Sequence, residues 1–96
     1  MYVVIFRAKV RNLGAQYLEM VQRMWDIAIS QFGRIEFHSV TEGRDEVVLS
    51  HWPDEESIRA WKAHPDHILA QKSGRERWYE SYSVQVAQIG REYRRQ

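Results

Sequence analysis

The sequence contains no cysteine, and this absence excludes several kinds of chemistry. Disulfide bonds, thiolate nucleophiles and cysteine-ligated metal sites all need the thiol side chain. The composition suits a reducing compartment, where proteins fold without disulfides. The first residues also lack the basic start and the small-residue cleavage site of a signal peptide. We therefore expect a cytoplasmic protein.

An excess of charge of one sign is also missing. Fourteen Lys and Arg residues face 13 Asp and Glu residues, which gives a formal net charge of +1. This balance creates no field that would attract nucleic acid or an anionic membrane. The basic tail, with Arg91, Arg94 and Arg95, is too short to indicate nucleic-acid binding without a recognised motif. No segment is apolar over the length that a bilayer requires. We expect neither nucleic acid nor a membrane as a partner.

The sequence also has no P-loop, no dinucleotide-binding glycine motif and no catalytic-serine motif. Internal repeats, low-complexity stretches and linkers are absent as well. What remains is a chain of 96 residues in which 44% are hydrophobic and 28% are charged. This balance is typical of a globular protein, so we expect a single domain over residues 1–96.

Hydrophobic periodicity and capping residues predict the order of the elements. Asn12 and Asp54 are plausible helix N-caps, Gly33 suits a helix C-terminus, and Gly43 lies in a short hairpin connection. Ser73-Gly74 is expected to break the second helical region. Strands are predicted over residues 2–10, 34–41, 46–52 and about 78–86, and helices over about 13–31, 55–63 and 65–72.

The order β-α-β-β-α-β predicts an α+β, ferredoxin-like fold, in which helices cover one face of a four-stranded antiparallel sheet. The predicted strands 2–10 and 46–52 carry Val, Ile and Leu on both faces. A monomer would therefore expose an apolar patch on the bare face of the sheet, and a homodimer that packs sheet against sheet would cover it. The alternative is that the apolar strands reflect β-propensity alone.

Candidate chemistry concentrates between Trp52 and Tyr82. His64 and His67 lie at helical spacing near Trp61 and Gln71, although a proline between the histidines disturbs that geometry. In one interpretation His64 precedes a helix and His67 is a surface residue. In the other, one of them is a general base. Two histidines without a firm third ligand do not indicate a metal site.

The other residues of this region also have two interpretations. Trp61 suits the core, or the wall of an aromatic-ligand pocket. Trp78 and Tyr79 belong to the same aromatic cluster, and Arg75 begins a charged run that suits a solvated face.

Residues 50–67 and 70–82 resemble the antibiotic biosynthesis monooxygenase superfamily, and the likeness extends over nearly the whole chain. Its specific features are the acidic helix start, Trp61 near the helix end, a histidine a few residues on, and the Gly-Arg…Trp-Tyr run. The resemblance implies the dimeric α/β barrel, in which two ferredoxin-like units pair through their sheets.

The resemblance also implies a reaction. Some relatives oxygenate phenolic or quinol-type aromatics with O2 and without metal or organic cofactor. In them the pocket lies between helices and sheet, a Trp matching Trp61 lines it, and an ionisable residue near the position of His67 assists proton removal. The deprotonated substrate then supplies an electron to O2. Our first hypothesis is such a monooxygenase, with His64 or His67 as proton acceptor, and with Arg75, Trp78 and Tyr79 among the substrate-binding residues.

Two alternatives remain. Other relatives bind and degrade haem with a His ligand further along the second helical region and an Asn in the first strand. Gln71 or Lys72 falls near that ligand position, and Phe6-Arg7 stand where the Asn would be. The third hypothesis is a non-catalytic dimer that binds a small hydrophobic molecule.

Overall fold

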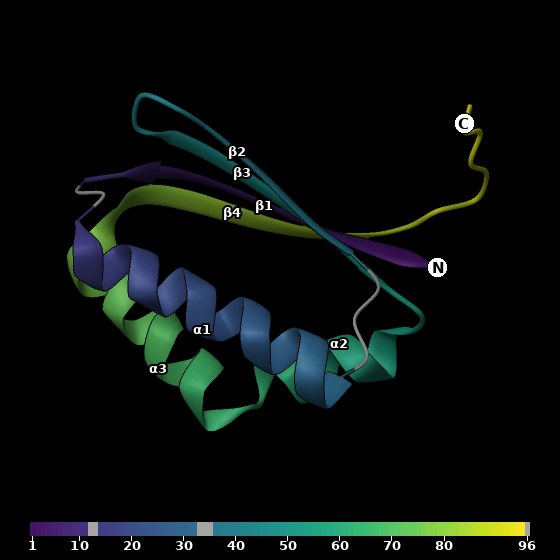
Figure 1. Cartoon of the computed structure of the whole chain (residues 1–96), viewed down its shortest axis with the longest axis horizontal. Helices are drawn as coiled ribbons and strands as arrows, with labels where there is room; N and C mark the ends of the chain where they lie inside the picture. The colour runs from purple at the N-terminus through teal and green to yellow at the C-terminus, as the bar shows by residue number, and fades with distance from the viewer. Residues whose placement is uncertain (12–13, 33–35, 96) are drawn as a thin grey trace.

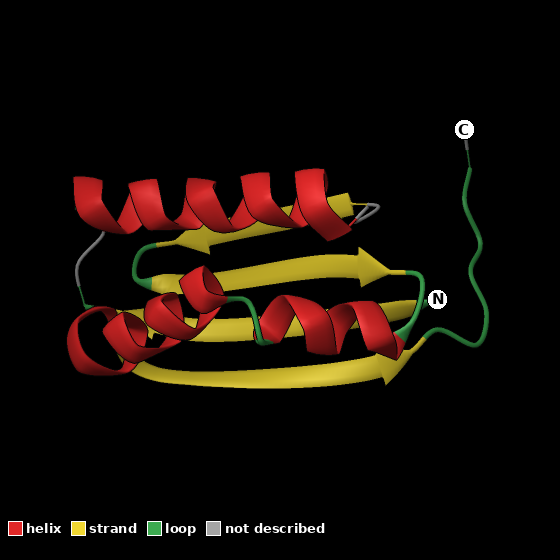
Figure 2. Ribbon diagram, turned by 90° about the horizontal axis from the view of Figure 1, so that it is seen from below, coloured by secondary structure: helices red, strands yellow, loops and turns green. Residues whose placement is uncertain are grey.

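The structure is a computed structural model that describes residues 1–11, 14–32 and 36–95. One antiparallel sheet has helices on one face, and its other face is bare (Figure 1, Figure 2). This arrangement confirms the predicted ferredoxin-like α+β fold. Along the chain the elements are β1 (Tyr2–Val10), α1 (Ala15–Phe32), β2 (Glu36–Glu42), β3 (Asp45–Trp52), α2 (Glu55–Lys62), α3 (Pro65–Ser73), η1 (Gly74–Trp78) and β4 (Tyr79–Gln88).

The sheet has the strand order β2-β3-β1-β4, so β1 and β3 are central and β4 is an edge. Ile5 lies opposite Leu49 on β3 and opposite Gln85 on β4. The β2–β3 hairpin pairs Glu42 with Asp45 and leaves a two-residue loop that begins at Gly43. Gly43 has a φ of 60°, and no other described residue has a positive φ. A glycine with positive φ at the first loop position is the pattern of a type II′ turn, which suits the twist of the strands.

The helix caps follow the sequence where the structure describes them. Asp54 accepts a hydrogen bond from the backbone N–H of Ser57 at 2.7 Å, which confirms it as the N-cap of α2. Glu55 and Glu56 form the acidic first turn, which the positive end of the helix dipole favours. The predicted cap Asn12 and the predicted terminator Gly33 lie outside the described residues.

The second helical region differs from the prediction. Ser73-Gly74 does not break it, because η1 continues the chain as one π-helical turn up to Trp78. Gly74 is buried, and a Cβ added there would lie 2.6 Å from a ring carbon of Tyr79. Gly74 has no Cβ, and this allows the backbone to lie close to the ring of Tyr79. This wider π-helical turn ends at Trp78, and β4 begins at the next residue, Tyr79.

The core lies between the sheet and the helices towards the end of β3. Trp52 is fully buried, and its indole N–H donates to Ser50 Oγ at 2.9 Å. The ring of Trp61 packs on it at 4.9 Å between centroids. The buried members of this cluster are Val4, Met24, Ile27, Ala28, Trp52, Ile58 and Trp61.

Alternation along the central strands separates the two faces of the sheet. Val4 and Phe6 face the helices, so Val3 and Ile5 face the bare side. On β3, Val47 and Leu49 lie opposite Arg7 and Ile5, which puts them on the same bare face. This face therefore carries half-buried aliphatic side chains with no helix above them. Among the described residues, no helix combines the length and apolarity needed to span a bilayer.

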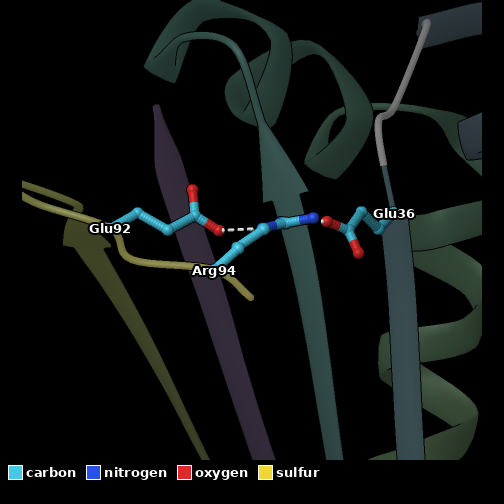
Figure 3. A network of polar contacts seen from close by, with 3 residues as sticks. All are labelled: Glu36, Glu92 and Arg94. Carbon is cyan, nitrogen blue, oxygen red and sulfur yellow. Dashed lines mark hydrogen bonds and ion pairs between the residues drawn. The ribbon is translucent and has the colours of Figure 1, made fainter. Parts of the chain in front are cut away.

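The C-terminal tail is tied to the sheet at two points. The backbone N–H of Ile89 donates to the carbonyl of Met1 at 3.0 Å. Arg94 then lies between Glu92 and Glu36, with N···O distances of 2.6 and 2.7 Å (Figure 3). These groups are solvent-exposed, so each ion pair contributes little to stability. Their effect is to direct the tail back towards β2.

Candidate functional site

A cavity of about 150 Å³ lies between the helices and the sheet. An engineered apolar cavity of similar volume is known to take up benzene, so the space suits an aromatic ring. Side chains from both layers form the wall. Its apolar part includes Val4, Phe6, Met24, Phe37, Val48 and Ile58.

The cavity is least covered along β4. Tyr82, Val84 and Val86 line it, yet each of them is 43% exposed. All three lie on the helix-facing side of the sheet, since Val84 and Val86 pair with Phe6 and Val4. Seen from the helix side, β4 runs along the margin of the sheet beyond the helices (Figure 2). Ligand access is therefore most direct from this edge.

One polar end of the cavity is formed by Trp61 and His67, at the junction between α2 and α3. The two rings lie 4.3 Å apart between centroids in an edge-to-face arrangement. Trp61 Nε1 and His67 Nδ1 are buried, and neither has a hydrogen-bond partner in the described part of the protein. A buried polar atom left unpaired costs about 1–3 kcal/mol, so this end is suited to receive a polar ligand atom.

The protonation state of His67 restricts what this end can bind. Burial lowers the pKa of His67 from 6.5 to about 4, and the charges of Lys62 and His64 act in the same direction. The imidazole is therefore neutral at pH 7 and has one donor and one acceptor nitrogen, while the Trp61 indole can only donate. A hydroxyl group would satisfy both residues, because its oxygen accepts from Trp61 and its hydrogen is donated to His67.

The other polar end is formed by Glu46, Tyr17 and Tyr79, and here the polar atoms bond one another. Glu46 is 5% exposed and Tyr17 is 2% exposed. The Tyr17 hydroxyl donates to the Glu46 carboxylate, and the Tyr79 hydroxyl donates to that of Tyr17 at 3.3 Å. Burial raises the pKa of Tyr79 to about 12. Burial, and then the bond to Glu46, raise the pKa of Tyr17 further. Both phenols keep their protons at neutral pH.

The structure brings together three of the predicted site residues. Trp61, His67 and Tyr79 line the same cavity. Their roles in binding or catalysis stay predictions, since position alone does not establish a role.

The other three predicted residues lie away from the cavity wall. The backbone carbonyl of His64 accepts from Ile68 N–H at 3.0 Å, as expected of a residue that begins a helix, and its ring lies 6.2 Å from that of Phe32. Arg75 is exposed on η1. Trp78 packs edge-on against the outer side of Tyr17 at 5.7 Å and lines a separate groove between α1 and α3.

Two residues of the site were missed by the sequence interpretation, namely Glu46 and Tyr17. The sequence predicts Tyr17 only as part of the helix over about 13–31, and Glu46 only as the first residue of the strand over 46–52. The available signal was the alternation of β3, which puts Glu46 on the face of Ser50 and Trp52. A carboxylate on the buried face of a strand needs a partner, and this requirement would have singled it out.

The positions implied by haem-degrading relatives do not fit an iron ligand. Gln71 lines the cavity, Lys72 is exposed, and Phe6 contributes only its ring to the wall. Haem iron is held by His, Cys, Met or Tyr, and none of these occupies the implied positions. Within the described ranges, no three His, Cys, Asp or Glu side chains gather into a group that could hold a metal ion.

The sequence has a curated relative in Bacillus subtilis, the uncharacterized protein YqjZ. The two are 37% identical over 93 residues, which cover 95% of this chain and 81% of YqjZ. No protein-family profile matches the sequence.

Solved structures match the fold at low sequence identity. SnoaB from Streptomyces nogalater, described as a cofactor-independent oxygenase, has a TM-score of 0.79 at 15% identity, with 95% of this chain and 94% of SnoaB covered. Rv0793 from Mycobacterium tuberculosis also has a TM-score of 0.79 at 15% identity, and 95% and 96% of the two chains are covered. An antibiotic biosynthesis monooxygenase matches with a TM-score of 0.75 at 12% identity, over 93% and 98% of the chains. At these identities the comparison concerns the fold.

Proposed function

Because this chain belongs to the family of YqjZ and has the antibiotic biosynthesis monooxygenase fold that its sequence resembles, we propose that it is a monooxygenase. Its proposed substrate is a small phenolic or quinol-type aromatic compound, oxidised with O2 without a metal or organic cofactor. One observation carries this proposal: an apolar cavity of ring size is lined by Trp61 and His67, whose buried ring nitrogens Nε1 and Nδ1 have no hydrogen-bond partner among the described residues.

The substrate ring would lie in the apolar part of the cavity with its hydroxyl at the Trp61–His67 end. The hydroxyl would donate to His67 and accept from the Trp61 indole N–H, which relieves the unpaired state of both nitrogens. His67 is favoured over His64 as proton acceptor, since His67 lines the cavity. Tyr79 is favoured over Arg75 as the orienting residue for the same reason.

The overall reaction balances without a further reductant. A phenol and one O2 give a quinone and one water: one oxygen atom bonds to the ring carbon para to the hydroxyl, and the other leaves as water. The substrate supplies all four electrons. It first passes one electron to O2, and the resulting radical and superoxide combine at the ring carbon.

His67 is a weak base in this scheme, and this suits the order of the steps. A neutral imidazole with a pKa of about 4 holds the phenol proton in a hydrogen bond rather than removing it beforehand. When the electron leaves, the oxidised phenol becomes far more acidic and its proton moves to His67. The Trp61 N–H donates to the phenol oxygen and holds the hydroxyl against His67 while the proton moves.

Oxygen uptake tests this proposal directly. Wild-type protein, Trp61→Phe and His67→Ala are incubated with a panel of phenols and quinols, and O2 consumption is followed with an electrode. We expect both variants to lose at least about tenfold in rate, because Trp61→Phe loses the donor that positions the hydroxyl and His67→Ala loses the proton acceptor. His38→Ala is the matched control, since His38 is exposed on β2. Uptake no faster than in buffer with every panel member would contradict the proposal.

The protein is also proposed to act as a homodimer. Val3, Ile5, Val47 and Leu49 form an apolar stripe on the bare face of the sheet, and a second copy packed sheet against sheet would cover it. Sedimentation at micromolar concentration should give twice the chain mass for the wild type and the chain mass for Leu49→Glu. A wild type that sediments as a folded single chain would rule out this assembly.

A further inference from the structure

The groove between α1 and α3 shares part of its wall with the cavity. Met20 and Met24 from α1 and Ala70 from α3 line both spaces. A side chain that borders a space on each side is the full thickness of the wall at that point. The groove is also lined by Glu19 and Arg23, which are exposed to solvent. In the described part of the chain, the two methionines and the alanine therefore separate the cavity from water at this place.

This shared wall is made of side chains that can move. Met20 and Met24 are one helical turn apart on α1, so their side chains are neighbours. Methionine is unbranched and has three rotatable bonds, so it adapts its shape more readily than Leu or Ile. Ala70 adds only a methyl group on the side of α3, and both Ala70 and Met20 are half-buried. The gap left by one displaced thioether suits a diatomic molecule and is too narrow for an aromatic ring.

The passage that such a displacement opens differs in position from the β4 edge. Ala70 lies one turn after His67 on α3, so the two side chains share a face of that helix. A molecule that passes Ala70 therefore arrives beside His67. Figure 2 shows α1 and α3 above the sheet and β4 at its margin beyond them. The cavity thus has a wide approach along β4 and a narrow one between the helices.

The proposed reaction gives these two approaches different uses, because an aromatic compound and O2 must be in the cavity together. The cavity measures about 150 Å³, so a ring that enters along β4 fills most of it. The ring then obstructs the approach through which it came. O2 is small and apolar, so its transfer from water into an apolar space is favourable. It needs a second approach that the ring does not occupy.

We infer that Met20, Met24 and Ala70 form a gate, through which O2 enters the cavity from the groove between α1 and α3 while an aromatic ligand occupies the side of β4. The inference rests on the proposed function, since O2 is a reactant only there. The gate selects by size and by polarity. Thioethers and a methyl group offer water no good hydrogen-bond partner, so the passage favours an apolar molecule over water.

Tryptophan phosphorescence measures the arrival of O2 without any turnover. Trp52 is fully buried and packs on Trp61, which lines the cavity. O2 that reaches this pair of rings shortens the long-lived emission of the buried indole, and the dependence on O2 concentration gives a quenching constant. The measurement is made with saturating benzene, which suits a cavity of this volume and obstructs the side of β4. Benzene has no hydroxyl group, so the proposed reaction cannot consume it.

Ala70→Leu should lower the quenching constant at least about threefold, because the larger side chain fills the space between the two methionines. Ala60→Leu is the matched control, since the same substitution is made at an exposed position of α2, and it should keep the wild-type constant. If Ala70→Leu does not fold, Met20→Ile replaces a flexible thioether by a β-branched side chain. This variant should lower the constant at least about twofold.

An unchanged quenching constant in folded Ala70→Leu or Met20→Ile protein would overturn the inference. Failure of the proposed function is separate and visible in the oxygen electrode. Quenching that depends on Ala70 without any oxygen uptake would contradict the monooxygenase proposal and support the gate. Oxygen uptake in which Ala70→Leu keeps the wild-type KM for O2, together with unchanged quenching, would support the reaction and exclude the gate.

Discussion

The two ends of the cavity satisfy their buried polar atoms in different ways. At the Glu46 end the hydroxyls of Tyr17 and Tyr79 form a chain of hydrogen bonds that ends on the carboxylate. At the Trp61–His67 end the two buried nitrogens have no partner within the described residues. The first arrangement stabilises the folded protein, whereas the second costs stability until a ligand arrives. Mutations at the Glu46 end should therefore lower stability at pH 7, whereas a mutation of His67 should change how stability depends on pH.

Acidification should lower the free energy of unfolding because His67 is buried without a partner, and this is the largest effect that we expect. The folded-state pKa of His67 is about 4 and its ordinary value is 6.5, so between these values the unfolded chain binds the extra proton. Stability therefore falls as the pH drops from 6.5 to 4, by up to about 3 kcal/mol at 1.36 kcal/mol per pKa unit.

Urea unfolding at pH 7 and pH 4 measures this effect in the wild type and in His67→Asn. The variant should lose less stability on acidification, because it lacks the titrating imidazole. Equal losses in the two proteins would mean that His67 titrates normally in the fold.

Breaking the paired end should destabilise the protein directly. Tyr17→Phe removes the hydroxyl that bonds Glu46 and leaves a buried carboxylate without its tyrosine partner. We expect a loss of about 2–3 kcal/mol in the free energy of unfolding at pH 7. Tyr93→Phe removes a hydroxyl from a residue that is 83% exposed and should change stability by less than about 0.5 kcal/mol. Similar losses in the two variants would show that the buried chain of hydrogen bonds has no special role.

Displacing Tyr79, whose hydroxyl donates to Tyr17 at the Glu46 end, should lower stability by less. Gly74→Ala puts a Cβ about 2.6 Å from the Tyr79 ring, and the ring must move to relieve the overlap. Overpacking of this kind typically costs 1–3 kcal/mol, so we expect a loss of about 2 kcal/mol. Gly90→Ala adds the same methyl group in open space and is the control. Thermal unfolding of the two variants measures the difference, and a Gly74→Ala protein as stable as Gly90→Ala would argue against tight packing of Tyr79.

The fold could be predicted because strand-forming residues and helix caps act through neighbours in the sequence. The prediction of β1 follows from its β-branched and aromatic residues, which run from Tyr2 to Phe6. Asp54 caps α2 because its side chain reaches the free N–H of Ser57. The continuation of the chain through Gly74 could not be predicted in this way. Glycine usually signals a break, but here it accommodates the ring of Tyr79, a contact that depends on the path of the chain into β4.

The candidate site was predicted only in part for a similar reason. Trp61 and His67 were found because their residue types are informative and they lie close together in the sequence. Glu46 and Tyr17 are separated by 29 positions, and their pairing depends on how α1 lies across the sheet. A helical stripe cannot specify which of its residues meets a carboxylate on a distant strand. Interactions of this kind become visible only when the packing of the layers is known.

The position of β4 at the margin of the sheet has a consequence for substrate size. In the described sheet β4 pairs with β1 alone, whereas β3 is held by strands on both sides. An outward shift of β4 would strain one ladder of hydrogen bonds and leave the centre of the sheet intact. The cavity can therefore widen along β4, while the part of its wall formed by β3 keeps its shape. Bulky substituents would be tolerated where a ligand faces β4 and rejected where it faces β3.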